Sequence, residues 1–233
     1  MSSQRDPWPT AGPIQGVIFD IHSTLLDQGD AATWLDAALA LTPHPLSEDE
    51  RLDLLEFLDR IWEGARIVDP DSTRDLSFVH HSRVFHELID GGPSVDRSLA
   101  DALYEVMLDT WHAYDDAVPT LRALRADGIS VCLLSNAGVS IRPVLDREGI
   151  TPWVDAMILS FEVGVVKPDE RIFRAALDAL GLPAAHVLMV GDNAKDDGGG
   201  AALGIRTLIL PRTDGRVHGL NAVTSLVRGV NRL

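Results

Sequence analysis

From about Val118 onward, the chain alternates short apolar runs with stretches of helical periodicity, and this alternation limits the folds open to it. Strands are predicted at 129–135, 154–160, 187–191 and 205–210, with an earlier one at 14–20. Helices are predicted before the strand at 129–135, at 119–127, and between the later strands, at 139–148 and 169–180. Strand, helix and strand in regular order are typical of a parallel sheet with right-handed crossovers. The sequence therefore predicts an α/β protein.

A long stretch without strands separates the first predicted strand from the second. Ser47 and Glu50 have the spacing of a capping box, and the residues after them repeat apolar side chains at helical spacing. Other helices are predicted at 31–41, within 72–90 and over 99–111. We expect a flexible tail at 1–13, an α/β core made of 14–28 and 115–233, and an inserted all-helical cap at 29–114.

Charge and cysteine content restrict the partners. The 233 residues include 20 Lys and Arg against 35 Asp and Glu, a formal charge of −15 that disfavours nucleic acid and anionic membranes. No apolar run approaches the roughly 18 residues of a membrane span. The single cysteine, Cys132, excludes an intramolecular disulfide. Because the start of the chain carries no secretory signal, we expect a cytoplasmic protein, monomeric or homodimeric, that acts on a small molecule.

Polar side chains suited to chemistry follow the predicted strands. They are Asp20 and His22 after the first strand, Ser135 and Asn136 after the second, Lys167 before a helix, and Asp192, Asp196 and Asp197 after the strand at 187–191. Ligands of open parallel sheets bind beyond the carboxyl ends of the strands. We therefore expect Asp20, Ser135, Lys167 and Asp192 to meet in one pocket.

Taken in order, these motifs resemble those of the haloacid dehalogenase superfamily. The family pattern is Asp-x-Asp-x-Thr, a Ser or Thr after a strand, a Lys, and then Gly-Asp followed by a later Asp. The similarity covers the whole core, about residues 14–30 and 115–210, and the inserted helices fall where that family carries its helical cap. The resemblance implies a Rossmann-like core and Mg²⁺-dependent hydrolysis of a small phosphorylated metabolite, a phosphate monoester, through an aspartyl-phosphate.

The resemblance also implies catalytic and substrate-binding roles. Asp20 matches the nucleophile, which attacks phosphorus and splits one difficult displacement into two easier ones. Ser135 matches the hydroxyl that holds a phosphoryl oxygen, together with main-chain N–H groups around Asn136. Lys167 matches the cation that balances the negative charge of nucleophile and phosphate.

The implied Mg²⁺ ligands are all oxygens, the donors that this ion prefers. They are the carboxylates of Asp20 and Asp192 and the main-chain carbonyl of His22. Asp197 matches the later acidic position of the last motif better than Asp196 does, although Asp196 stays an alternative.

His22 stands where the family's phosphatases have a second Asp that acts as general acid and base. A histidine, with an unperturbed pKa near ~6.5, can take over that work, and turnover should then have an acid-to-neutral optimum. The same substitution can instead mark a different chemistry, or His22 can be a purely structural residue.

Two other functions stay open. In the dehalogenase branch of the family the Asp attacks carbon, no metal is needed and the first Asp of the last motif is absent. The presence of Asp192 therefore favours chemistry at phosphorus. The other alternative is a binding or regulatory protein that kept the fold and lost turnover, which the retention of Asp20, Lys167 and Asp192 together disfavours.

Substrate choice is expected to depend on the inserted helices. Arginines such as Arg66 and Arg74 and aromatic rings such as Trp62 and Trp111 can form a pocket for an anionic or ring-bearing leaving group. Because Trp62 and Trp111 fall on apolar helix stripes, the favoured interpretation is that they are core residues. Arg74 and Asp75 are predicted to form a surface ion pair. Cys132 lies inside an apolar strand and is predicted to be buried.

Overall fold

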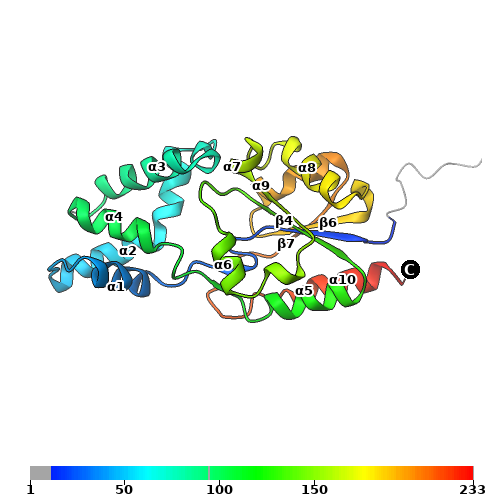
Figure 1. Ribbon diagram of the computed structural model, residues 1–233, viewed down its shortest axis with the longest axis horizontal. Helices are drawn as coiled ribbons and strands as arrows, with labels where there is room; N and C mark the ends of the chain where they lie inside the picture. Colours follow the sequence, from blue (N-terminus) through cyan, green and yellow to red (C-terminus); the bar gives the residue numbers. More distant parts are fainter. Residues whose placement is uncertain (1–11, 94, 233) are drawn as a thin grey trace, which may run out of the picture.

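The computed structural model describes residues 12–93 and 95–232. Its centre is a sheet of five parallel strands in the order β5–β4–β1–β6–β7 (Figure 1). The strands are β1 (Gly16–Phe19), β4 (Ser130–Ser135), β5 (Ala156–Leu159), β6 (Val187–Gly191) and β7 (Arg206–Ile209). Each lies inside a run that the sequence assigns to a strand, so the predicted α/β core is confirmed.

Helices cover both faces of this sheet (Figure 1). α5 (Ala117–Ala126) and α10 (Asn221–Val230) contact each other on one face, and α8 (Glu170–Leu180) lies on the other. The sequence analysis does not predict α10. Its β-branched residues have low helix propensity, and packing of Val223 and Val227 against the core is what stabilises it.

Shorter elements complete the core. They are the helices α6 (Arg142–Arg147), α7 (Ser160–Val163) and α9 (Ala194–Asp197), and the 3₁₀ segments η2 (Thr151–Trp153), η3 (Ala184–His186) and η4 (Gly198–Leu203). None of the described helices combines the length and apolar character that crossing a membrane requires.

β1 shows why the strands read as unbroken apolar runs. Its Val17 and Phe19 side chains join the apolar cluster under α5 and α10, whereas Ile18 joins the cluster under α8. Successive side chains of a strand point to opposite faces of the sheet. A strand between two layers of helices therefore needs apolar residues at every position.

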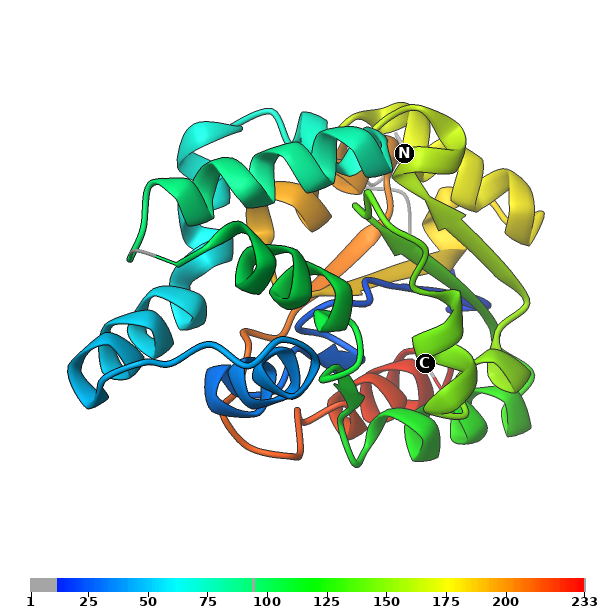
Figure 2. The ribbon, with the colours of Figure 1, turned by 60° about the vertical axis from the view of Figure 1, so that its left-hand side comes forward.

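The segment between β1 and α5 is mostly helical and lies beside the sheet (Figures 1 and 2). It contains α1 (Ala31–Leu41), α2 (Glu48–Val68), the 3₁₀ segment η1 (Thr73–Leu76), α3 (Phe78–Asp90) and α4 (Arg97–Val106), which we call the inserted helices. A short antiparallel pair, β2 (Leu26–Asp27) with β3 (His112–Ala113), joins the two ends of this segment.

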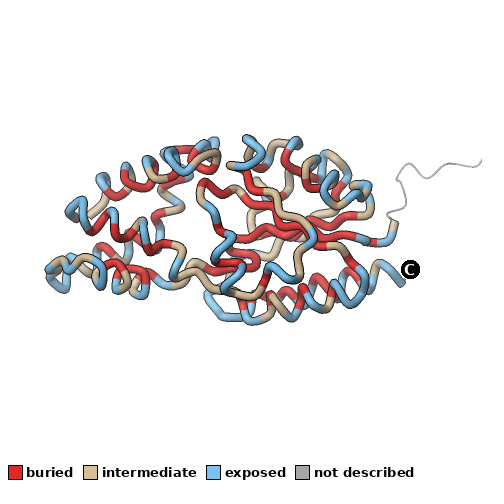
Figure 3. Tube along the Cα trace, viewed as in Figure 1, coloured by how far each residue is buried: buried red, intermediate tan, exposed pale blue. Residues whose placement is uncertain are grey.

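The inserted helices have an apolar core of their own. Each α-helix contributes to it, for example with Trp34, Leu58, Phe85 and Leu103, and Figure 3 shows buried positions running along the helices in stripes. The predicted capping box is present at the start of α2. The boundaries 29–114 for a cap domain stay a prediction, and the predicted flexible tail at 1–13 lies almost wholly outside the described residues.

Two helices predicted in this segment differ in extent from the observed ones. The stretch 72–90 is interrupted, because η1 ends at Leu76 and the Ser77 side chain then caps α3. The helix predicted over 99–111 ends at Val106. As a result, Arg74 and Trp111 lie outside α-helices.

The inserted helices contact the core at the loop after β4. Ser160 Oγ donates to the main-chain carbonyl of Asp75 in η1 and accepts the N–H of Ala137. A Cβ on Gly138 would lie 2.3 Å from the carbonyl oxygen of Arg74. A side chain at position 138 would therefore separate η1 from this loop.

Gly138→Ala tests this contact. We expect the added methyl group to lower the free energy of unfolding by about 1–3 kcal/mol, as overpacking does, in chemical denaturation. Gly229→Ala in α10 is the matched control, since a Cβ there meets nothing within 4 Å. Equal losses in the two variants would contradict a steric role for Gly138.

Candidate active site

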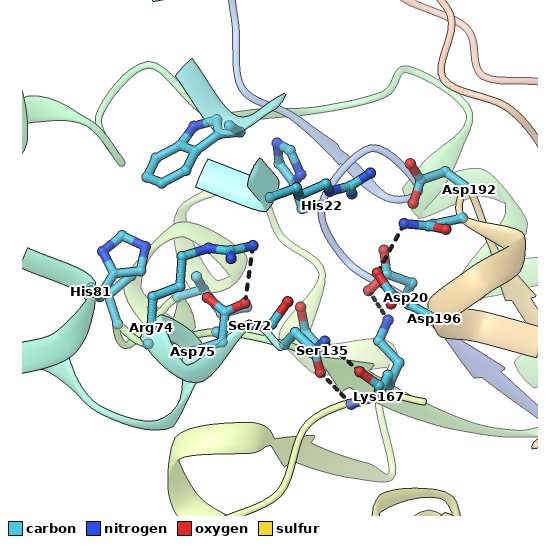
Figure 4. Close-up of a pocket in the computed structure, with 18 of the residues that line it drawn as sticks. Asp20, His22, Ser72, Arg74, Asp75, His81, Ser135, Lys167, Asp192 and Asp196 are labelled. Atoms are coloured by element: carbon cyan, nitrogen blue, oxygen red, sulfur yellow. Dashed lines mark hydrogen bonds and ion pairs between the residues drawn. The ribbon is translucent and has the colours of Figure 1, made fainter. Parts of the chain in front are cut away.

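Three neighbouring strands bring the predicted site residues together. Asp20 follows β1, Ser135 ends β4 and Asp192 follows β6, and β1 lies between the other two strands. Lys167 comes from the loop before α8. All four line one cavity of about 130 Å³, together with His22, Asn136, Asp196 and Asp197 (Figure 4). The expected convergence at the carboxyl ends of the strands is what the structure shows.

Lys167 lies between two carboxylates. Its Nζ donates to Asp20 Oδ1 at 2.6 Å and to Asp197 Oδ1 at 2.7 Å. The exposed fractions of Asp20, Lys167 and Asp197 are only 6%, 4% and 0%. Burial alone would lower the pKa of Lys167, but the two carboxylates outweigh it and raise the pKa above the ordinary lysine value. The ammonium therefore stays charged.

The negative charges of Asp20 and Asp192 are only partly balanced by nearby positive charge. Burial raises the pKa of Asp20 to about 7; Lys167 opposes this shift, while the charges of Asp197 and Asp192 add to it. Burial and then Asp197 also raise the pKa of Asp192. One lysine is thus too little positive charge for this group of acids, and a further cation would favour the ionised Asp20 that a nucleophile requires.

The same group of acids fits a divalent cation. Carboxylate oxygens of Asp20, Asp192 and Asp197 lie within 4.8 Å of one another. Three carboxylates and one ammonium leave two negative charges, and hard oxygen ligands suit Mg²⁺. In the part of the chain that the structure describes, no hydrogen bond reaches the Asp192 carboxylate or the His22 main-chain carbonyl. Both oxygens are therefore available as ligands.

Asp197, rather than Asp196, joins this group. Its second oxygen accepts the N–H of Asn193 at 3.0 Å, whereas Asp196 accepts the Asn193 side chain at 2.9 Å. A Cβ at Gly191 would lie 2.0 Å from Asp197 Oδ2, so a glycine is required before Asp192. The spacing argument that favoured Asp197 agrees with this geometry.

The His22 ring lies in the wall of the cavity, in surroundings that favour its neutral form. It packs on Trp111 with ring centroids 4.7 Å apart, and its Nε2 is buried without a hydrogen-bond partner among the described residues. Burial, together with the nearby charge of Arg212, lowers the pKa of His22 to about 4. The predicted acid-to-neutral optimum needs an imidazolium, which this environment disfavours. The structure thus speaks against His22 as the proton donor.

Asn136 acts on Lys167 through its side chain. Its Oδ1 accepts the Lys167 N–H at 2.7 Å and its Nδ2 donates to the Lys167 carbonyl at 3.1 Å. Both ends of the amide bond the Lys167 backbone, so the side chain positions the lysine, while the substrate contact predicted for Asn136 stays a prediction. Ser135, buried in the cavity wall, keeps its predicted place.

The inserted helices line the opposite side of the cavity, with cations and aromatic rings together. Trp62 and Trp111 pack against apolar clusters, as their place on the helix stripes predicts, and they also line the cavity. Arg74 and Asp75, expected at the surface, are buried there with exposed fractions of 8% and 6%. Arg66 also lines it. The break in helical periodicity before α3 is the signal that could have placed Arg74 and Asp75 at a contact instead of on a solvated helix.

A buried carboxylate beside a lysine at the ends of parallel strands is an arrangement suited to catalysis, and comparison with known proteins gives the family. Residues 14–204 match the model of the haloacid dehalogenase-like hydrolases. The chain is 32% identical over 203 residues to (S)-2-haloacid dehalogenase 1 of Pseudomonas sp. (strain CBS-3), covering 86% of both chains. It is 37% identical over 139 residues to the phosphoserine phosphatase of Thermus thermophilus, covering 56% of this chain and 54% of that one. The protein belongs to the haloacid dehalogenase-like hydrolases.

Solved structures share the fold. The L-2-haloacid dehalogenase of Xanthobacter autotrophicus superposes with a TM-score of 0.70 at 20% identity, covering 93% of this chain and 99% of that one. A phosphatase of the family from Thermococcus onnurineus has a TM-score of 0.64 at 22% identity and covers 94% and 100%. Both kinds of hydrolase are thus built on this architecture.

Lys167→Met tests the charge balance of the site in protein freed of metal by a chelator. Removing the ammonium leaves Asp20 and Asp197 buried without their cation, and we expect the free energy of unfolding to fall by about 3–5 kcal/mol near neutral pH. The pKa of Asp20 should rise further, so folded protein holds more protons than unfolded protein, and the loss should grow as pH rises from acid to neutral. A loss that does not change with pH would contradict this account.

Proposed function

We propose that the protein is a Mg²⁺-dependent phosphatase that hydrolyses a small phosphate monoester through an aspartyl-phosphate on Asp20. The observation that carries the proposal is the third carboxylate. Asp192 lies against Asp20 and Asp197 with Lys167 as the one ammonium among them. Burying three carboxylates beside a single ammonium costs free energy of folding unless a divalent cation balances the remaining negative charge.

Each residue of the site has a task in this reaction. Asp20 attacks phosphorus, Ser135 donates its hydroxyl to a phosphoryl oxygen, and Lys167 balances the charge that gathers between them. Asp20, Asp192 and the His22 carbonyl would hold Mg²⁺, supported by Asp197. When bound, the ion neutralises charge on the transferred phosphoryl group. Water then hydrolyses the aspartyl-phosphate and regenerates Asp20.

Relatives support chemistry at phosphorus as one of two possibilities. The ribulose-1,5-bisphosphate 5-phosphatase of Halopiger xanaduensis is 29% identical over 202 residues, covering 83% of both chains. The second candidate function is dehalogenation at carbon, favoured by the 32% identity to the Pseudomonas dehalogenase. That reaction releases halide, which needs neither a proton nor a metal, and it leaves Asp192 without a task.

Asp192→Asn separates the two candidates. For the phosphatase we expect Mg²⁺-dependent release of phosphate from nitrophenyl phosphate, abolished by chelator and in Asp20→Asn, and strongly reduced in Asp192→Asn. Asp196→Asn, which alters the neighbouring acid outside the cluster, should cause a smaller loss. Halide release from a 2-haloacid in the presence of chelator, unaffected by Asp192→Asn, would support the dehalogenase instead.

His22→Ala tests whether the imidazole carries a proton. Because the ring is neutral and buried, we expect the variant to slow hydrolysis of alkyl phosphates and of nitrophenyl phosphate by similar factors. Nitrophenolate leaves without a proton and an alkoxide does not. A loss confined to alkyl phosphates in steady-state rates would restore His22 as the general acid.

A further inference from the structure

Asp75 presents a poorly satisfied carboxyl group to the active-site cavity. It lines the same cavity as Asp20 but comes from η1, on the side of the inserted helices (Figure 4). The group is buried, yet among the described residues no hydrogen bond reaches its carboxyl oxygens, and its ion pair with Arg74 Nη2 is long at 3.5 Å. A buried carboxyl without donors is poised to interact with what enters the cavity.

The position of Asp75 is tied to the catalytic loop. Its main-chain carbonyl accepts from Ser160 Oγ, which in turn accepts the N–H of Ala137 at 2.9 Å. Ala137 lies two residues after Ser135, in the loop that ends β4. The carboxyl of Asp75 is therefore held relative to the phosphate-binding hydroxyl by a chain of hydrogen bonds, without depending on the bound substrate.

The charges around Asp75 keep it close to its protonated form. Burial raises its pKa to about 6; Arg74 opposes this, Asp69 and Asp196 add to it, and Lys167 lowers it. Both protonation states are thus accessible near pH 6, as a group that first gives and then takes a proton requires.

The other elements packed against η1 do not change this balance. On α3, burial lowers the pKa of His81 to about 4, with Arg74 adding to the shift, so this ring is neutral. On α7, Glu162 is paired with Arg142 at 2.9 Å.

We propose that Asp75 is the general acid and base of the reaction, a catalytic carboxyl supplied by the inserted helices; this rests on the proposed phosphatase function. As Asp20 forms its bond to phosphorus, the bond to the leaving oxygen breaks. That oxygen keeps the electron pair and takes the proton of Asp75, which becomes a carboxylate. In the second step the Asp75 carboxylate takes a proton from a water molecule. The oxygen of that water bonds to phosphorus, and the bond from Asp20 to phosphorus breaks. Phosphate, Asp20 and protonated Asp75 result.

Asp75→Asn tests the proposal with two esters in the presence of Mg²⁺. With nitrophenyl phosphate we expect an initial burst of nitrophenol equal to the enzyme concentration, because the first step needs no acid, followed by slow steady turnover. With glycerol 2-phosphate we expect no burst and a rate at least about 100-fold below wild type, the lower end of what general acids contribute. In wild type, the first step with the alkyl ester should slow as pH rises through about 6, and Asp75→Asn should remove this dependence.

Asp69→Asn is the matched control. Asp69 also pairs with Arg74, at 3.3 Å, but does not line the cavity. If Asp75 only held Arg74 in place, both variants would show the same pattern, and the proposal would fail. It would also fail if Asp75→Asn, folded by circular dichroism, slowed the first step equally for both esters. Should wild type release no phosphate from either ester, the phosphatase function itself would be wrong.

Discussion

The contact of Lys167 with Asp20 and Asp197 is the interaction on which the rest of the site depends. It joins the end of β1 and the helix α9 to the loop before α8, and the ammonium is buried in the interior of the protein. Asn136 holds the backbone of Lys167 from the end of β4, and Gly191 leaves room for Asp197. Segments far apart in sequence thus position Lys167, and Asp192, which Lys167 does not contact, completes the proposed cation site.

The positive charges inside the cavity would make the acidic character of the chain compatible with the proposed anionic substrate. The protein has a formal charge of −15, which repels phosphate at a distance. Attraction has to be local, and the cavity contains Lys167 together with Arg66 and Arg74 from the inserted helices. In the proposed reaction, a bound divalent cation would add to these charges beside the phosphoryl group. Binding of such a substrate should therefore depend on charges inside the cavity and gain little from the protein surface.

The core could be predicted because its signals are local. Strands buried on both faces are continuous apolar runs, as β1 shows. Polar side chains at the carboxyl ends of parallel strands lie at one edge of the sheet, whatever the details of the loops. For the side of the cavity formed by the inserted helices, the sequence offers a pocket with cations and aromatic rings only as one of two interpretations. Trp62 and Trp111 carry the same apolar pattern whether they face a core or a cavity. Arg74 and Asp75 are buried only because η1 docks on Gly138 and Ser160, a contact between residues more than 60 positions apart that no local pattern encodes. The burial that makes the His22 ring neutral has the same long-range origin.

The central claim is that Asp20 attacks phosphorus. The most direct measurement is intact-mass spectrometry of enzyme mixed with nitrophenyl phosphate and Mg²⁺ and quenched in acid, followed by peptide mapping. The account predicts a mass increase of one phosphoryl group, located on the peptide that contains Asp20 and absent from Asp20→Asn. An unmodified Asp20 under these conditions, together with a carbon ester at Asp20 after mixing with a 2-haloacid in chelator, would contradict it.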